Sequence, residues 1–374
     1  MLTPFDDYPV HQTALPIAHA GNGHPDQYDR FWFNGYTEDL YFAVALGIYP
    51  NRGVIDAAFS VVSDGLQRSA FASGRVPLDR TATTIGPITI QIVEPLRTNR
   101  IVVDAPEYGL GADLTFRTRT AAYEEPRQTK FNGTRLFTDM TRASQLGSWT
   151  GTLTAGERTE TFDGQRVYGT KDRSWGIRPA GLPAPAAPEP GAGQLFFLWA
   201  PVNFDDVAVH FMTFEDADGQ SWAKTGAILP LLNDTDPVYG PQDTAEHVDI
   251  SHAINWSPGL RRSDGAMLTF DAPSGYGTIE LEPLLTFRMK GAGYFHPQWA
   301  HGLWHGELAV GGECADVAEL DNLDFHNIHV QQVMRATWGD RSGIGVLEQL
   351  AIGPHAPSGF TDLLDGAPAH PPRC

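Results

Sequence analysis

Short strand-like segments separated by turn residues recur along the chain, and this pattern restricts the fold more than any other feature. Residues 63–65, Ser-Asp-Gly, predict a tight hairpin turn, because Asp and Gly tolerate the backbone angles of such turns. No long segment keeps the 3.6-residue period of an amphipathic helix, and 124–144 is the best helical candidate. The predicted strands of the first half are 28–36, 39–49, 53–62, 66–72, 85–93, 100–104, 112–119, 148–154 and 159–162. Such strands favour an all-β sandwich or barrel over an α/β fold.

The length of the chain favours two domains, since 374 residues exceed the usual size of a single hydrophobic core. We expect strands 194–201 and 207–214 to complete the first domain, 1–228. The second domain, 229–374, would hold the remaining predicted strands, 247–256, 266–271, 278–287, 303–310, 329–338 and 345–352. The Pro- and Ala-rich stretch 180–193 has a composition that cannot pack, and we interpret it as a long loop of the first domain in preference to a linker.

Charge and apolar content make several classes of partner poor candidates. The chain has 26 Lys and Arg against 45 Asp and Glu, a net charge of −19, and no basic tract, which disfavours nucleic acid and anionic membrane surfaces. The longest apolar run, 40–49, is far too short to span a membrane. Cys314 and Cys374 provide no disulfide framework, and the N-terminal residues do not resemble a signal peptide. We therefore expect a cytoplasmic protein.

Familiar nucleophile and cofactor motifs are missing from the sequence. It contains no Gly-x-Ser-x-Gly elbow, phosphate-binding loop, dinucleotide fingerprint or Cys-x-x-Cys pair. Aromatic residues make up 11% of the chain, which suits a thick β core or a pocket for a hydrophobic ligand. These features favour a reaction that needs no cofactor.

The stretch 168–179 combines an acid, guanidinium groups and an indole between a strand-like run and the Pro-rich segment. In a strand, the period of two places Asp172 and Ser174 on one face and Arg173 and Trp175 on the other. The stretch predicts a ligand-facing strand end at which Trp175 stacks on the ligand and Asp172 or an Arg supplies the polar chemistry. The alternative is a surface ion pair beside a half-buried Trp.

Several features across the middle third of the chain belong together. They are Tyr168, the Asp172-x-x-Trp175-Gly176 strand end, the aromatic strand Leu195–Trp199 and a strand that closes on Asp216–Gly219. This set resembles the carotenoid 1,2-hydratase superfamily, which includes kievitone hydratases and lipocalin-like Diels–Alderases. The resemblance implies an all-β fold of two fused lipocalin-like antiparallel β-barrels, with the active site in an apolar cavity and no metal requirement.

One position departs from the hydratases. They carry His where this chain has Arg173, and the resemblance links that His to protonation of an alkene. Because Arg does not release its proton in proteins, the proton here must come from Asp172 or from a His elsewhere. The resemblance also places His210 and Asp216 roughly where the hydratases have a Tyr and an Asp, although we favour Asp216 as simply the first residue of a turn.

The protonation state of Asp172 depends on its two Arg neighbours. Burial beside Trp175 would raise its pKa, whereas Arg173 or Arg178 at short range would lower it. If either Arg faces Asp172 closely, the carboxylate acts as a base or an orienting group; if both point away, it can act as an acid. Arg178 could instead bind a carboxylate or enolate oxygen of the substrate.

A second cluster of polar and aromatic side chains lies at 294–307. A strand across this stretch would place His301, His305 and Glu307 on one face, together with Trp299. Two histidines and one carboxylate are the ligand set of some zinc and non-haem iron sites. The spacing matches no strong metal motif, so we favour His301 or His305 as a general acid or base over a metal ligand. The alternative is two partly buried, hydrogen-bonded histidines. The Tyr-to-Trp-to-Gly order of 294–302 echoes 168–176 and suits a duplicated barrel.

The expected function is a cofactor-independent lyase or isomerase, meaning a hydratase, dehydratase or cyclase. Its substrate would be a hydrophobic unsaturated small molecule such as a terpenoid, a steroid or a polyphenol. We expect Asp172, His301, His305 and Arg173 to take part in catalysis. The residues expected to bind the substrate are Tyr168, Trp175, Arg178, Trp199, His210, Tyr294, His296, Trp299 and Trp304. The alternatives are a non-catalytic carrier of the same kind of ligand and a metal-dependent enzyme built on His301, His305 and Glu307.

Overall fold

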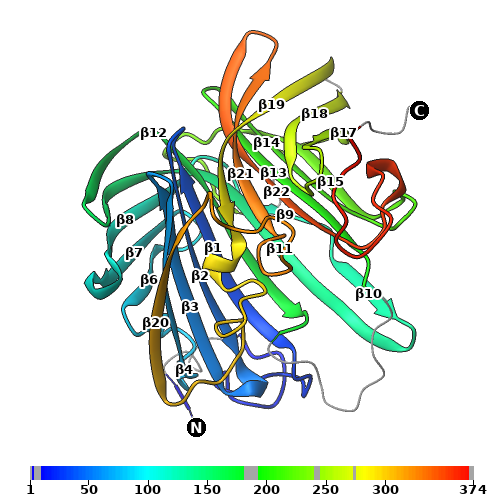
Figure 1. The fold of residues 1–374 in the computed structure, drawn as a ribbon. Helices are drawn as coiled ribbons and strands as arrows, with labels where there is room; N and C mark the ends of the chain where they lie inside the picture. The colour runs from blue at the N-terminus through cyan, green and yellow to red at the C-terminus, as the bar shows by residue number, and fades with distance from the viewer. Residues whose placement is uncertain (1, 4–9, 181–192, 240–244, 273–274, 370–374) are drawn as a thin grey trace.

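The chain forms two nearly closed antiparallel β-barrels (Figure 1), which confirms the predicted fold class. The computed structural model describes residues 2–3, 10–180, 193–239, 245–272 and 275–369. Strands and short 3-10 turns make up the regular structure of these ranges, without an α-helix. No helix in the described ranges is long and apolar enough to cross a membrane.

The first barrel is built from thirteen strands. Eleven follow the order β20-β4-β3-β2-β1-β12-β11-β8-β7-β6-β5, and two short strands, β9 and β10, pair with β11. Their bounds are β1 Gln27–Tyr36, β2 Leu40–Tyr49, β3 Val54–Ser63, β4 Leu66–Arg75, β5 Thr84–Ile85, β6 Ile88–Glu94, β7 Thr98–Ala105, β8 Leu110–Thr118, β9 Tyr123–Glu124, β10 Gln128–Asn132, β11 Arg135–Ala155, β12 Arg158–Ile177 and β20 Leu308–Asp316. Three 3-10 turns, η2 Pro50–Arg52, η3 Pro106–Tyr108 and η4 Met289–Ala292, contact these strands.

The second barrel has nine strands in the order β16-β15-β14-β13-β22-β21-β19-β18-β17. Their bounds are β13 Leu195–Phe204, β14 Val207–Glu215, β15 Ser221–Pro230, β16 Glu246–His247, β17 Asp249–Trp256, β18 Ser263–Ala272, β19 Gly275–Arg288, β21 Val330–Trp338 and β22 Arg341–Ile352. A last 3-10 turn, η5 Ala356–Ser358, follows them.

Aromatic side chains fill the interior of the first barrel. Trp149 packs edge-on against Phe33, Phe42 and Phe116, with ring centroids 5.1–5.9 Å apart, and its indole N–H donates to the Asn34 carbonyl. Alternate residues of β1 therefore point in opposite directions, since Phe31 and Phe33 belong to this core while Trp32 does not. The outward face of β1 is left to contact the second barrel.

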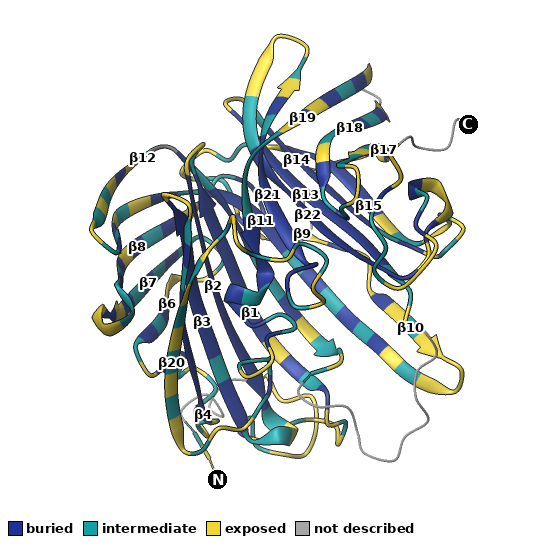
Figure 2. Ribbon diagram, viewed as in Figure 1, coloured by how far each residue is buried: buried dark blue, intermediate teal, exposed yellow. Residues whose placement is uncertain are grey.

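A third apolar cluster joins the two barrels. It combines Trp32, Tyr41 and other outward side chains of β1 and β2 with residues of the second barrel such as Trp199 and Val333. Figure 2 shows that strands β1, β2, β13 and β22 are mostly buried where the barrels meet. Residues on the outer face of β1 and β12 are therefore shielded from solvent by a different domain.

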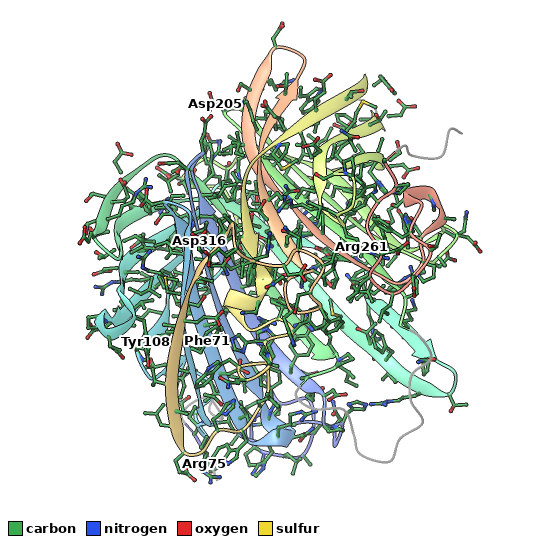
Figure 3. All side chains as sticks on the ribbon, in the orientation of Figure 1. Phe71, Arg75, Tyr108, Asp205, Arg261 and Asp316 are labelled. Atoms are coloured by element: carbon green, nitrogen blue, oxygen red, sulfur yellow. The ribbon has the colours of Figure 1, made fainter. Side chains whose placement is uncertain are left out.

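Strand β20 crosses from the second half of the sequence to the first barrel, where it pairs antiparallel with β4 along its whole length. In Figure 3, Phe71 and Tyr108 lie beside the middle of β20, while Arg75 and Asp316 mark its two ends. Arg75 of β4 forms an ion pair with Glu307, which immediately precedes β20. The exchanged strand links the two barrels by backbone hydrogen bonds.

Several details differ from the sequence-based expectations. The helical candidate 124–144 is strand β10 and the first half of β11. Strands β13 and β14, which we assigned to the first domain, belong to the second barrel, so the chain changes sheets between Ile177 and Leu195 and not near residue 228. Of the Pro- and Ala-rich stretch 180–193, which we interpreted as a loop, residues 181–192 lie outside the described residues.

Candidate active site between the two barrels

The outward face of β1, β12 and β11 carries two rows of polar side chains. Directly paired residues of antiparallel strands point to the same face, so each row is a set of neighbours. The first row is Arg30, Ser174 and Arg142, and the second is Trp32, Asp172 and Ser144.

Asp172 is a buried carboxyl with incomplete hydrogen bonding. Its side chain is 13% exposed, and Oδ1 has no hydrogen-bond partner among the described residues. Oδ2 lies 3.8 Å from Arg142 Nε, which is too far for a hydrogen bond. Burial raises the pKa of Asp172 to about 7, although Arg142, Arg178 and Arg30 all oppose the rise. The group therefore exchanges a proton near neutral pH.

Arg142 forms its close ion pair with a different acid, Glu125. Arg142 Nε and Nη2 donate to the two Glu125 oxygens at 2.8 and 2.7 Å, and His210 Nε2 lies 3.1 Å from Glu125 Oε1. Burial alone would raise the pKa of Glu125, but Arg142 and His210 outweigh it and lower that pKa to about 2. Since Glu125 stays ionised and holds Arg142, Asp172 is left as the protonatable carboxyl.

Tyr294 lies next to this face, in the turn that follows η4. Its ring packs edge-on against His301 and His329, with centroid separations of 4.8 and 4.9 Å. The guanidinium carbons of Arg30 and Arg178 lie 4.6 and 5.9 Å from the ring centroid. Tyr294 thus contacts two arginines, Arg30 and Arg178, and two histidines, one in the turn after η4 and one just before β21.

His301 is held in one neutral form. Its Nε2 lies 2.8 Å from Arg30 Nη2, and because a guanidinium can only donate, Nε2 must accept. The ring proton is then on Nδ1, which lies 3.9 Å from Asp56 Oδ1. Burial, followed by the charges of Arg30 and Arg178, lowers the pKa of His301 well below its ordinary value. His301 therefore orients Arg30 and has no acidic proton to give at neutral pH.

Several buried polar atoms around Asp172 and Tyr294 have no hydrogen-bond partner among the described residues. Such atoms are uncommon in folded proteins, because each one costs about 1–3 kcal/mol when it is left unpaired. These atoms are able to bond to a polar ligand. They are Asp172 Oδ1, Arg30 Nε and Nη1, Trp32 Nε1, Tyr49 Oη, Trp199 Nε1 and His329 Nδ1.

A small pocket adjoins this cluster. It is lined by residues of β3, β4 and the turn after η4, including Asp56, Phe71, Ser73, Trp299, His301 and His305. Burial raises the pKa of Asp56 to about 6, against the opposing hydrogen bond from the Gly302 N–H. A wider groove is lined by residues of β17, β18, β19 and β21, between Ala253 and Thr337. Only the smaller pocket contacts the polar cluster.

Three residues predicted for the site lie away from Asp172. Arg173 points to the other face of β12, where it bonds Asp29 Oδ1 at 2.7 Å. Trp175 is on that face too and is 42% exposed. Tyr168 lies under the guanidinium of Arg119 at 4.4 Å, near the middle of β12 and four residues before Asp172. By contrast Trp199, His210, Arg178, Tyr294 and His301 all lie at the cluster described above.

The predicted strand geometry of 299–307 is wrong. Residues 293–307 form turns, because Gly293, Gly302 and Gly306 all have positive φ, and β20 begins only at Leu308. His305 packs on Trp299 with ring centroids 4.7 Å apart, whereas Glu307 is exposed and paired with Arg75. His301, His305 and Glu307 therefore do not converge. The described part of the chain holds no group of three or more His, Cys, Asp or Glu placed to bind a metal.

The two remaining predicted residues have structural contacts. His296 Nδ1 accepts the backbone N–H groups of Gln298 and Trp299 at 3.0 and 2.8 Å and so stabilises the turn. Trp304 is 47% exposed and lies under the guanidinium of Arg75 at 5.2 Å.

Four residues of the site were missed by the sequence analysis: Arg30, Trp32, Arg142 and Glu125. Arg30 had a local signal, since it is a cation inside the aromatic segment 28–36. Glu125 and Arg142 had none, because they reach the site only through the pairing of β11 with β12 and the turn after β9. Strand pairing between distant segments cannot be read from local sequence.

A solved structure with a similar fold is found among known proteins. A crystal structure of kievitone hydratase from Nectria haematococca superposes with a TM-score of 0.50 at 13% identity, covering 86% of this chain and 88% of that chain. A crystal structure described as a putative AttH from Nitrosomonas europaea aligns with a TM-score of 0.47 at 13% identity, over 91% of this chain and 98% of that chain. No curated protein sequence matches. A family model matches residues 2–361, and the chain therefore belongs to this family of unknown function (DUF8625).

Proposed function

We propose that this protein is a hydratase-like lyase or isomerase that acts, without a cofactor, on a hydrophobic unsaturated small molecule. The observation that carries the proposal is Asp172, a buried carboxyl with an unpartnered Oδ1 and a pKa of about 7. The fold shared with kievitone hydratase, a hydratase by name, supports the reaction class, although a fold alone does not establish an activity.

In the proposed reaction, protonated Asp172 donates its proton through Oδ1 to one carbon of a carbon–carbon double bond. Positive charge develops on the adjacent carbon, where the faces of Trp32, Trp199 or Tyr294 stabilise it by cation–π interaction. Water then adds to this carbon and returns a proton to the Asp172 carboxylate, which completes hydration. Loss of a neighbouring proton to the same carboxylate gives an isomer. Attack by a second double bond forms a ring and moves the positive charge to another carbon, and loss of a proton from the carbon next to it to the carboxylate completes the cyclisation. Arg142, 3.8 Å away, stabilises the carboxylate in between.

The test combines isotope labelling with one isosteric variant. Purified protein is incubated with unsaturated terpenoids, steroids and flavonoids in heavy-oxygen water, and products are separated and weighed by mass spectrometry. Heavy oxygen in a product identifies hydration, and a new product of unchanged mass identifies isomerisation or cyclisation. We expect Asp172→Asn to lower turnover by about 100-fold or more, the usual contribution of a general acid.

The matched control is Asp104→Asn, which changes an exposed carboxyl on β7 of the same barrel. This variant should keep full turnover. Equal turnover by Asp172→Asn and the wild type would overturn the proposal. So would a protein that returns every compound unchanged but retains some of them through desalting, since that behaviour is typical of a carrier.

A further inference from the structure

Two arginines of the site, the buried Arg30 and the partly buried Arg178, have no carboxylate within ion-pairing distance among the described residues. Arg30 is 2% exposed; its Nη2 contacts the neutral His301, and its Nε and Nη1 have no hydrogen-bond partner. Arg178 stands 4.9 Å from the ring of Tyr28 and 5.9 Å from that of Tyr294. Within the described ranges no Asp or Glu oxygen lies within ion-pairing distance of either guanidinium.

The neighbouring acids are already engaged elsewhere. Glu125 is held by Arg142, and Glu348 accepts hydrogen bonds from His329 at 2.6 Å and Gln331 at 2.7 Å. Asp56 accepts the Gly302 N–H at 2.6 Å. None of these carboxylates forms an ion pair with Arg30 or Arg178, although Arg30 acts to lower the pKa of Asp56 and both arginines act to lower that of Asp172.

The nearby phenols do not supply the missing charge either. Burial raises the pKa of both Tyr28 and Tyr49 above the ordinary value for tyrosine, so both side chains are neutral at physiological pH. Buried cations without a counter-ion are costly, and a guanidinium binds a carboxylate through two parallel hydrogen bonds. Arg30 and Arg178 therefore form an anion site beside Tyr294.

We propose that the substrate is an unsaturated hydrophobic acid, whose carboxylate binds between Arg30 and Arg178 while its double bond reaches Asp172. This inference rests on the proposed function and names the substrate class of the same site. The acid would present its carboxylate to the unpartnered Nε and Nη1 of Arg30. Its hydrocarbon part would lie against the aromatic side chains between the barrels, such as Trp32 and Trp199.

Anion binding has a consequence for the acid at Asp172. The charged groups that act on Asp172 are Arg142 from β11, Glu125 before β10, Arg178 after β12 and Arg30 from β1. Arg30 and Arg178 both favour the ionised carboxylate, and a bound anion would cancel part of their effect. A bound substrate anion would thus raise the fraction of Asp172 that is protonated, and the protonated form is the proposed general acid. Binding near pH 7 should take up a fraction of a proton in the wild type and a smaller fraction in Asp172→Asn, where Asp56 is the remaining carboxyl on which Arg30 acts.

The experiment measures binding, so it does not depend on turnover. Titration calorimetry is run at pH 7 in phosphate and in Tris, with geranic acid, farnesoic acid and their methyl esters as probes. We expect each acid to bind about tenfold or more tightly than its ester, as for hydrogen bonds to a charged group. Arg30→Gln and Arg178→Gln should abolish this preference, and Arg30→Lys should keep part of it. Arg100→Gln, at an exposed ion pair on β7, should leave it unchanged.

The outcomes separate this inference from the proposed function. Esters that bind as tightly as the acids would overturn the anion site, whether or not the protein turns them over. A preference for acids that survives both Arg→Gln variants would overturn it as well. Tight binding of the acids with proton uptake but no turnover would support the anion site and contradict the enzyme proposal. Circular dichroism of each variant verifies that the barrels remain folded.

Discussion

Two carboxyl groups that share one arginine illustrate how small differences in position decide protonation. Glu125 bonds Arg142 through both oxygens, and its pKa falls to about 2. Asp172 lies 3.8 Å from the same guanidinium without a hydrogen bond, and its pKa rises to about 7. The Coulomb attraction to Arg142 offsets burial for the first group but not for the second.

The pH dependence of activity should report Asp172. Only the protonated form can donate, so kcat/KM should be highest below pH 7 and fall about tenfold per pH unit well above it. The residual activity of Asp172→Asn should lack this decline. A profile from pH 5 to pH 9 tests the expectation, and an unchanged decline in the variant would assign it to another group.

The same group should make stability depend on pH. Because the pKa of Asp172 is raised in the folded state, the unfolded chain loses this proton first as pH rises from about 4 to about 7. Asp172 therefore makes its full contribution to the free energy of unfolding at low pH. That free energy falls by up to about 4 kcal/mol as the pH rises across this window. Relative to the wild type, Asp172→Asn should become progressively more stable between pH 4 and pH 8. Urea unfolding at several pH values measures the difference, and a difference independent of pH would contradict the raised pKa.

At the scale of elements, strand β12 places most of the site. Its alternation puts Asp172 and Ser174 toward the second barrel and Arg173 and Trp175 away from it, as the period of two predicts. The strand ends beyond Gly176, whose φ of +131° allows the backbone to approach β11 closely and to lead into Arg178. A side chain at this position would alter both the pairing and the place of Arg178.

A single methyl group at residue 176 tests this role. The Cβ of Gly176→Ala would stand 2.2 Å from the Asp139 carbonyl oxygen, so we expect the variant to lose about 1–3 kcal/mol of unfolding free energy. In the control Gly111→Ala, on β8, the nearest atom is 3.8 Å away and φ is not in the left-handed region. That control should unfold like the wild type. Equal losses in the two variants would show that the close approach at 176 is not the cause.

For the whole molecule, the arrangement of the barrels decides where the site lies. The interior of the first barrel is filled by Trp149 and its aromatic neighbours, and the polar groups gather between the barrels. The position differs from the apolar cavity that the hydratase resemblance implies. Strand β20 and the side chain of Gln67 both tie the barrels together, so the geometry of the site depends on their relative position.

Gln67 offers a direct test of this coupling. Its side chain is 4% exposed, donates to the Arg288 carbonyl at 2.8 Å and accepts the Arg288 N–H at 2.9 Å. Gln67→Ala leaves both backbone groups buried and unpaired, so we expect a loss of about 2–4 kcal/mol and lower turnover. The control Gln91→Ala changes an exposed residue of β6 and should have no effect. Unchanged stability of Gln67→Ala would show that this bridge does not couple the barrels.

The sequence by itself determined what depends on neighbouring residues. Turn residues and alternating patterns were enough for the all-β class, for most strands and for the two faces of β12, because these follow from local backbone preferences. The strand predicted across 299–307 failed because glycines with positive φ turn the chain there. Even so, Asp172, Tyr294 and His301 were recognisable as polar groups in unusual aromatic surroundings.

Only the tertiary structure decided which of these groups meet. The pairing of β1 and β11 with β12, and the placement of β13–β15 in the second barrel, join segments far apart in the chain. These pairings bring Arg30, Arg142 and Glu125 to Asp172 and send Glu307 to Arg75 instead. The protonation state of Asp172 depends on the tertiary structure for the same reason. Its pKa results from burial between two barrels and from charges on four separate segments, and no local pattern encodes either.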